Sequence, residues 1–122
     1  MLDGGIIDSI PVRRAQATGH EFNVVISTRN LGFSETGRDR KQPRFIYRNY
    51  PRLRVALSHR IEAYNHQLQM LEEMEQEGKI AVIRPQRPME VRRIEKDTQK
   101  LERLYEEGFR IGEEFVAEWH LA

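Results

Sequence analysis

Two stretches of the chain show the apolar spacing of an amphipathic α-helix. Apolar residues recur every three or four positions between residues 53 and 71, and again between residues 101 and 119. Positions three and four apart share one helix face, so each stretch predicts a helix with one buried face. The first helix is expected to begin near Asn49, with Pro51 in its first turn, and to end at Gly78 as one bent helix or two. The second is expected to follow an N-cap at Asp97.

Two short apolar runs, residues 22–28 and 80–83, predict strands. Both are rich in β-branched residues, and neither alternates with polar residues as a half-exposed strand would, so both are expected to be covered on two faces. A short helix is predicted before the first run, with Ser9 as N-cap, Pro11 near its start and Gly19 at its end. Because helices separate the strands, the pattern predicts an α/β fold with a parallel pair. Two strands alone make a poor sheet, which favours further strands outside this sequence.

The last helix carries two glycines, Gly108 and Gly112, on its apolar stripe. This position predicts that a neighbouring backbone approaches closely there. Trp119 lies on the same stripe and is expected to belong to the core. Residues 29–50 contain glycine, proline and many charges, and are expected to be mostly loop.

Composition narrows the class of protein. The chain has 122 residues, enough for one domain, and is 39% hydrophobic and 32% charged. It has no cysteine, which excludes disulfides, thiolate zinc sites and a cysteine nucleophile and fits a cytoplasmic location. The sequence has no apolar run of about 18 residues and no secretory signal pattern near its start.

Charge is distributed unevenly. Residues 29–60 carry nine basic and two acidic side chains, a balance of +7 against +1 for the whole chain. Aromatic residues are interleaved, a mixture that suits contact with an anionic lipid surface at the inner membrane. The residues predicted for that contact are Arg38, Arg40, Lys41, Arg44 and Arg48. The alternative is a solvated loop that pairs with the acidic flanks, and without a nucleic-acid fold signature we predict no nucleic-acid partner.

One further pair of residues has a spacing that metals use. Glu62 and His66 are four residues apart and would share a helix face. Two ligands are too few for a site, so the sequence predicts no metal.

The first residues suggest a site. Asp3-Gly4-Gly5 predicts a tight turn that needs either a positive φ or a close backbone approach, with an aspartate held just before it. Asp8, Ile10-Pro11-Val12 and the apolar run at residues 23–26 follow at short distances. In this order, the sequence resembles the bacterial patatin-like phospholipases. The resemblance continues through Tyr50-Pro51, Tyr64-Asn65, Glu77-Gly78-Lys79, Ile83-Arg84-Pro85 and residues 100–108, and so covers nearly the whole chain.

The resemblance implies a chemistry and a fold. Members of this family resemble acyl hydrolases that use a Ser-Asp dyad without metal or cofactor to cleave carboxylic esters of lipids. Asp3 would be the catalytic base, Gly4 and Gly5 would let the turn pass close to the nucleophile, and Asp8 and Ser9 would support the turn. Residues 1–28 would end the catalytic domain of a three-layer α/β/α fold. Residues 29–50 would form the basic loop, and residues 51–122 an α/β C-terminal subdomain.

The sequence departs from the family at one decisive point. None of its serines stands in a Gly-x-Ser-x-Gly nucleophile motif, and no glycine-rich oxyanion loop occurs. We therefore expect a C-terminal fragment of such an enzyme, inactive alone because it carries the base without the nucleophile. The alternative is a small non-catalytic domain that binds or associates with itself through an exposed sheet edge.

Overall fold

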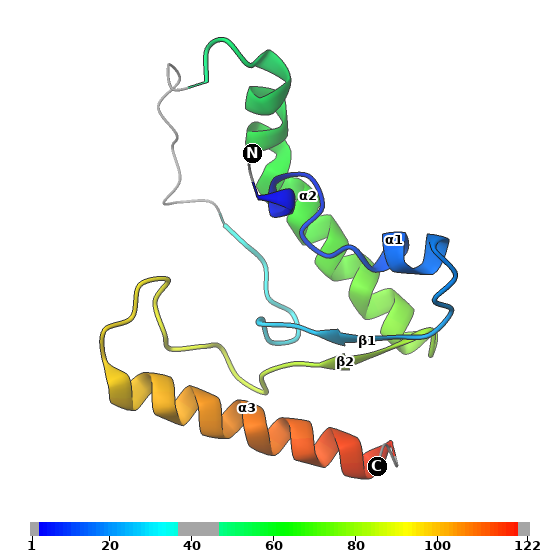
Figure 1. Ribbon diagram of the computed structural model, residues 1–122, viewed down its shortest axis with the longest axis vertical. Helices are drawn as coiled ribbons and strands as arrows, with labels where there is room; N and C mark the ends of the chain where they lie inside the picture. Colours follow the sequence, from blue (N-terminus) through cyan, green and yellow to red (C-terminus); the bar gives the residue numbers. More distant parts are fainter. Residues whose placement is uncertain (1–2, 37–46, 120–122) are drawn as a thin grey trace.

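The structure is a computed structural model that describes residues 3–36 and 47–119. In chain order its elements are a 3₁₀ turn η1 (Gly4–Ile6), helix α1 (Val12–Ala17), strand β1 (Asn23–Ile26), helix α2 (Pro51–Gln76), strand β2 (Ile80–Ile83) and helix α3 (Thr98–Glu118). Figure 1 shows α2 and α3 on opposite sides of the two strands. The predicted mixture of helices with a small parallel sheet is therefore confirmed.

The sheet of the described residues has two parallel strands, β1 and β2. Asn23 pairs with Ile80 and Ile26 with Ile83, so the four residues of each strand are in full register. Parallel strands need a long crossover, which here includes α2. The carboxyl ends of both strands therefore lie at the same edge of the sheet, next to the segments that follow them.

The core lies between α2 and the sheet. Its most buried residues are Leu71 and Ile80, and the other members of the cluster are Val12, Met70 and Met74. Ile10, Val25 and Val82 pack against this cluster from the edge. Burial of each large apolar side chain stabilises the fold by roughly 1.5–3 kcal/mol, so the carboxyl-terminal half of α2 is the part of the helix most strongly fixed to the sheet.

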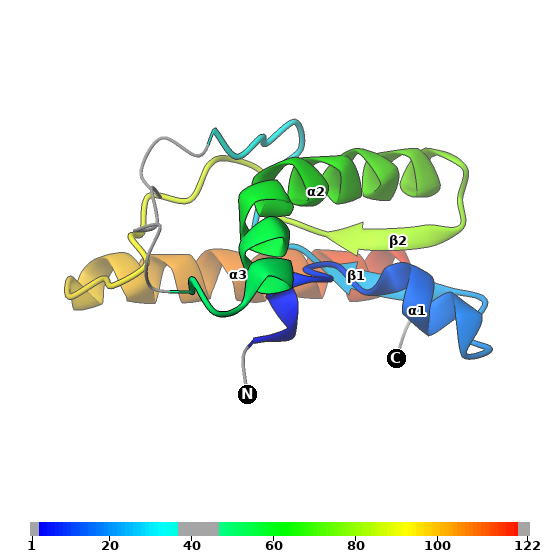
Figure 2. The same ribbon diagram turned by 90° about the horizontal axis from the view of Figure 1, so that it is seen from above.

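Helix α2 is one continuous helix that changes direction along its length (Figure 2). All the buried residues of α2 lie between Leu68 and Met74, so its first turns contribute none. The sequence left one bent helix or two as alternatives, and the structure has the single bent helix.

Several predicted ends are confirmed. Pro51 is the first residue of α2, and Gly78 follows its end with φ +70°, a conformation that favours glycine. The Asp97 side chain caps α3 by accepting hydrogen bonds from the backbone N–H groups of Gln99 and Lys100. The second strand occupies residues 80–83 as predicted.

The predicted cap of α1 is wrong. Pro11, not Ser9, occupies the N-cap position, and no side chain caps this helix. The helix begins at Val12, three residues after Ser9, so Ser9 lies too early to cap it. The Ser9 hydroxyl instead donates a hydrogen bond to the carbonyl of Gly5 at 2.6 Å.

The predicted burial of β1 on both faces is also wrong. Val24 and Ile26 are 44% and 77% exposed, whereas Val25 packs against the core. Helix α1 contacts β1, but α3 contacts β2, so within the described residues one face of β1 has no cover.

Helix α3 keeps much of its apolar stripe exposed. The exposed members are Leu101, Tyr105, Phe109, Val116 and Trp119. Trp119 is 43% exposed, stacks on Phe115 and contacts the tilted ring of Phe22 rather than entering the core. A Cβ atom added at Gly108 or Gly112 would meet no atom of the described residues within 4 Å. The expected close backbone approach at these glycines is therefore wrong.

None of the helices in the described part of the chain is both long and apolar enough to cross a membrane.

Candidate functional site

Asp3 is held at the start of the η1 turn. Its Oδ1 atom accepts a hydrogen bond from the backbone N–H of Gly5 at 2.8 Å, which makes it the N-cap of the turn. A Cβ atom at Gly5 would lie 3.2 Å from that same oxygen, tighter than an ordinary van der Waals contact. Gly4 and Gly5 are not among the glycines with positive φ. Within the described residues, neither reason that the sequence offered for this glycine pair is found, because the atoms nearest to a Cβ at Gly5 belong to the side chains of Asp3 and Ser9 and not to a neighbouring backbone.

The exposed carboxylate of Asp3 borders a hollow of about 390 Å³. We call it the Asp3 hollow. It lies between the η1 turn, the segment after β1 and the middle of α2, and its lining residues are Asp3, Gly5, Ser9, Thr28, Arg29, Glu35, Leu57, Arg60, Ile61 and Tyr64. Its volume is in the range of roughly 300–1,000 Å³ that small-molecule sites occupy.

Gln67 of α2 fixes the segment that carries Asp3. Its side-chain amide donates to Oδ1 of Asp8 at 2.7 Å, and its carbonyl oxygen accepts from the backbone N–H of Ile10 at 3.2 Å. Asp8 was predicted to support the turn, and the structure places its carboxylate in this contact. The same glutamine therefore binds two residues of the link between the η1 turn and α1.

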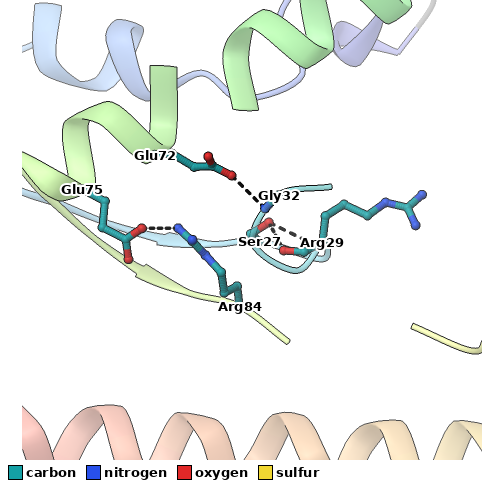
Figure 3. A network of polar contacts seen from close by, with 6 residues as sticks. All are labelled: Ser27, Arg29, Gly32, Glu72, Glu75 and Arg84. Carbon is teal, nitrogen blue, oxygen red and sulfur yellow. Dashed lines mark hydrogen bonds and ion pairs between the residues drawn. The ribbon is translucent and has the colours of Figure 1, made fainter. Parts of the chain in front are cut away.

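Two other side chains of α2 fix the segment after β1. The Asn65 side chain accepts from the backbone N–H of Glu35 at 2.8 Å and donates to the Glu35 carbonyl at 2.9 Å. Glu72 accepts from the backbone N–H of Gly32 at 3.0 Å (Figure 3). Three polar residues of one helix thus hold the walls of the Asp3 hollow.

The arrangement offers a proton acceptor beside cationic side chains. The Gly5 hydrogen bond engages Oδ1 of Asp3, and within the described residues Oδ2 accepts no hydrogen bond. Ser9 lines the same hollow, but its hydroxyl proton is directed at the Gly5 carbonyl. Arg29 and Arg60 line the hollow as well. A carboxylate in this position can accept a proton from a hydroxyl group that enters the hollow.

A second hollow, of about 240 Å³, opens between the carboxyl ends of the strands and α3. We call it the apolar hollow. Its surface is almost entirely apolar, and its apolar side chains are those of Ile26, Ile83, Pro85, Met89, Leu104 and Ile111. Thr28 borders both this hollow and the Asp3 hollow, so the two are neighbours at one edge of the sheet.

Most of the residues predicted for lipid contact lie outside the part of the chain that the structure describes. Arg38, Arg40, Lys41 and Arg44 lie outside the described residues, and Arg48 is exposed in the turn before α2. Glu62 contacts His59, with Oε2 at 3.6 Å from Nδ1, rather than His66. Among residues 3–36 and 47–119, no three histidine, aspartate or glutamate side chains gather in a way that could hold a metal ion.

The residues that fix the site were not singled out from the sequence for this role. Asn65 was noted only as part of a motif, and Gln67 and Glu72 lie among other polar residues of α2. Their partners are 30 to 59 residues away, so no local spacing marks them. A polar side chain close to the apolar stripe of a helix is the one signal that favours such contacts.

Comparison with known proteins gives one match. Neither the curated proteins nor the solved structures contain a match to the chain. A family model described as a domain of unknown function, DUF6363, matches residues 50–121. That match includes α2, β2 and α3, and covers more than half of the sequence. The chain therefore belongs to the DUF6363 family.

Proposed function

We propose that this chain supplies the aspartate base of a lipid ester hydrolase that resembles the patatin-like phospholipases. One observation carries the proposal: the exposed Asp3 carboxylate, fixed by Gly5, borders a hollow of about 390 Å³ and keeps Oδ2 for a second donor. The order of Asp3-Gly4-Gly5, a helix and a strand of a parallel sheet supports it.

The proposed reaction is an acyl transfer in two steps. A serine hydroxyl gives its proton to Asp3 while its oxygen attacks the ester carbonyl carbon. The leaving alcohol takes that proton as the ester bond breaks, and water then hydrolyses the acyl-serine with Asp3 again as base. None of this chain's serines stands in a Gly-x-Ser-x-Gly motif. The proposal therefore assigns the nucleophile to a segment outside these 122 residues, within a three-layer α/β/α catalytic domain.

The apolar hollow supports a lipid substrate. It adjoins the Asp3 hollow at Thr28, and its lining is almost entirely apolar. A fatty acyl chain in the apolar hollow would place its ester group toward the Asp3 hollow. The basic residues that the sequence predicts for lipid contact, Arg38, Arg40, Lys41, Arg44 and Arg48, would add attraction to an anionic lipid surface, roughly 1 kcal/mol for each residue near it.

The test uses the polypeptide that carries this sequence in its source. An antibody against α3 isolates it, and its mass and its hydrolysis of a short-chain nitrophenyl ester are measured. We expect a mass well above 14.5 kDa and hydrolysis that Asp3→Asn reduces by about 10²–10⁴-fold, the contribution of a general base. Asparagine caps a turn as well as aspartate does, so this variant keeps the η1 turn and loses only the base.

Asp97→Asn is the matched control. Asp97 caps α3, and the same exchange preserves that cap while it changes the net charge equally. We expect its hydrolysis to equal that of the wild type. Hydrolysis that survives Asp3→Asn, or a polypeptide of 14.5 kDa without hydrolysis, would refute the proposal.

A second candidate function is self-association. It is favoured by the exposed apolar side chains of α3, among them Tyr105 at 69% and Phe109 at 57% exposure, and by the uncovered face of β1. Contiguous apolar surface of this kind is typical of interaction sites. Two copies of the chain could bury these surfaces against each other without any catalytic role.

A further inference from the structure

Four arginines line a third hollow, of about 340 Å³. We call it the arginine hollow. Arg29 follows β1, Arg60 belongs to α2, and Arg92 and Arg93 belong to the segment between β2 and α3. Met89 and Val91 complete its lining. Three segments far apart in the sequence thus contribute arginines to the lining of one hollow.

No carboxylate lines the arginine hollow. Within the described parts of the chain, the ion pairs closer than 4.0 Å include none of its four arginines. Two neighbouring arginines contrast with them, since Arg84 pairs with Glu75 and Arg87 with Glu107. Figure 3 shows Arg84 pointing at Glu75, whereas the Arg29 side chain extends away from Glu72 and Glu75.

Local contacts hold two of these arginines in place. The Ser27 hydroxyl accepts from the backbone N–H of Arg29 at 3.1 Å and donates to its carbonyl at 3.0 Å. The Arg29 guanidinium lies 4.4 Å from the centre of the Phe33 ring. On the other wall, the backbone N–H of Arg92 donates to Oε2 of Glu95 at 3.3 Å. The backbone at Arg29 and at Arg92 is therefore fixed before any ligand arrives.

Arginines that line one hollow with no carboxylate in that lining repel one another, and an anion among them reduces that repulsion. We propose that the arginine hollow binds the phosphate group of a small organic phosphate. Guanidinium groups match phosphate oxygens with paired N–H donors, and several of them can surround one phosphate.

The rest of the lining narrows the ligand class. Met89 and Val91 give the hollow an apolar wall, which a bare inorganic ion would leave without a partner. The volume of the hollow also exceeds what one phosphate needs and lies in the range of about 300–1,000 Å³ of small-molecule sites. An organic phosphate with an apolar substituent fits both features. The arginine hollow shares Arg29 and Arg60 with the Asp3 hollow and Met89 with the apolar hollow. The inference still does not rest on the proposed hydrolase, because phosphate binding needs neither the Asp3 base nor a serine nucleophile.

The test is titration calorimetry on the full 122-residue chain at constant ionic strength. The probes are phenyl phosphate, inorganic phosphate and sodium chloride. We expect phenyl phosphate to bind more tightly than inorganic phosphate, and chloride to give no saturable heat. The variant Arg92→Gln/Arg93→Gln should weaken phenyl phosphate by about tenfold or more, the loss expected when charge-assisted hydrogen bonds are removed. Both side chains are exposed, so the variant should fold.

Arg13→Gln/Arg14→Gln is the matched control. It removes two exposed arginines from α1, away from the lining of the arginine hollow, and should leave binding within about twofold. Equal weakening by both variants would show a general effect of net charge and overturn the site. Absence of saturable phosphate binding would overturn it as well.

A second arm separates the two sources of a phosphate group. Flotation with vesicles of phosphatidylglycerol, compared with phosphatidylcholine, measures binding of a lipid headgroup. Vesicle binding that phenyl phosphate displaces, and that Arg92→Gln/Arg93→Gln removes, assigns the site to a lipid phosphate. Saturable binding of phenyl phosphate without vesicle binding assigns it to a soluble phosphate. Vesicle binding that neither treatment changes counts against the arginine hollow as the point of lipid contact.

Discussion

At the scale of single residues, Gln67 determines where Asp3 lies. The Gln67 side-chain amide forms hydrogen bonds with both Asp8 and Ile10. These two hydrogen bonds hold the segment that carries the η1 turn against α2. We predict that Gln67→Ala lowers the free energy of unfolding by about 1–2 kcal/mol, the value of two partly exposed hydrogen bonds. Urea unfolding measures this change, and amide hydrogen exchange should show faster exchange at Ile10.

Gln69→Ala is the comparison for this prediction. Gln69 is exposed on the same helix. Within the described residues, its side chain forms a hydrogen bond with Glu73 of α2 and with no other element. We expect its unfolding free energy and the exchange at Ile10 to match the wild type. Equal losses in both variants would contradict the anchor, because Gln→Ala raises helix propensity and cannot by itself lower the stability of the helix.

Glu95 gives the segment before α3 a dependence on pH. Its carboxylate accepts from the backbone N–H groups of Asp97, Arg92 and Lys96, and these hydrogen bonds hold its pKa below the usual 4.5. A pKa lowered by folding means that the ionised form stabilises the fold. That contribution is present above pH 4.5 and is lost as the pH falls through the folded-state pKa.

We therefore predict that Glu95→Gln makes the unfolding free energy less dependent on pH below pH 4.5 than it is in the wild type. Urea unfolding at a series of pH values from 6 to 3 measures the slopes. Glu102→Gln, at an exposed position of α3, should keep the wild-type slope. If Glu95→Gln keeps it too, the hydrogen bonds of Glu95 do not stabilise the fold.

The sequence predicted one part of the candidate site and missed the rest for a physical reason. Asp3 and Gly5 act on each other across two residues, so their relation was visible as a motif. Gln67 and Arg92 act through partners in other elements. Their roles arise only when the chain folds, and no spacing along one sequence records them.

At the scale of elements, Gly78 lies in the turn between the end of α2 at Gln76 and the start of β2 at Ile80. Its φ of +70° strains any residue with a Cβ, although nothing in the described residues would crowd that atom. We predict that Gly78→Ala destabilises the fold by about 1 kcal/mol. Gly112→Ala should instead stabilise it by about 0.5–1 kcal/mol, because Gly112 lies inside α3 with open space around it. Thermal unfolding should show a lower melting temperature for Gly78→Ala and a higher one for Gly112→Ala than for the wild type. Shifts of the melting temperature in the same direction would contradict this account.

The ends of the elements were predictable, whereas their burial was less so. Element ends are determined by residues within one turn of them, and the local sequence contains those residues. The examples are Pro51 at the start of α2, Gly78 after its end and the Asp97 cap of α3. Burial depends on neighbours from elsewhere. The run at residues 23–26 has the composition of a strand covered on two faces, yet Ile26 is 77% exposed because α3 contacts β2 instead.

At the scale of the whole molecule, apolar surface gathers along α3 and over β1. The ring of Phe22, in the segment before β1, lies 5.4 Å from that of Trp119 between centroids, tilted by 39°, so the two surfaces meet near the end of α3. The sheet has two strands within the described residues, and such small sheets gain stability from further packing. The exposed apolar surface and the small sheet explain why both candidate functions involve a neighbour, either a catalytic domain or a second copy of the chain.

The two cases make different predictions for the isolated chain. If a second copy covers α3, the chain should sediment as a dimer at micromolar concentration, and Tyr105→Gln/Phe109→Gln should return it to a monomer of 14.5 kDa. Each exposed aromatic side chain that the dimer buries contributes roughly 1.5–3 kcal/mol, enough for two changes to dissociate a micromolar dimer. The control Leu31→Gln/Ile94→Gln also removes two exposed apolar side chains, but not from α3, and should remain a dimer. A wild-type chain that sediments as a monomer at all concentrations excludes a self-associating α3 and leaves the catalytic domain as its neighbour.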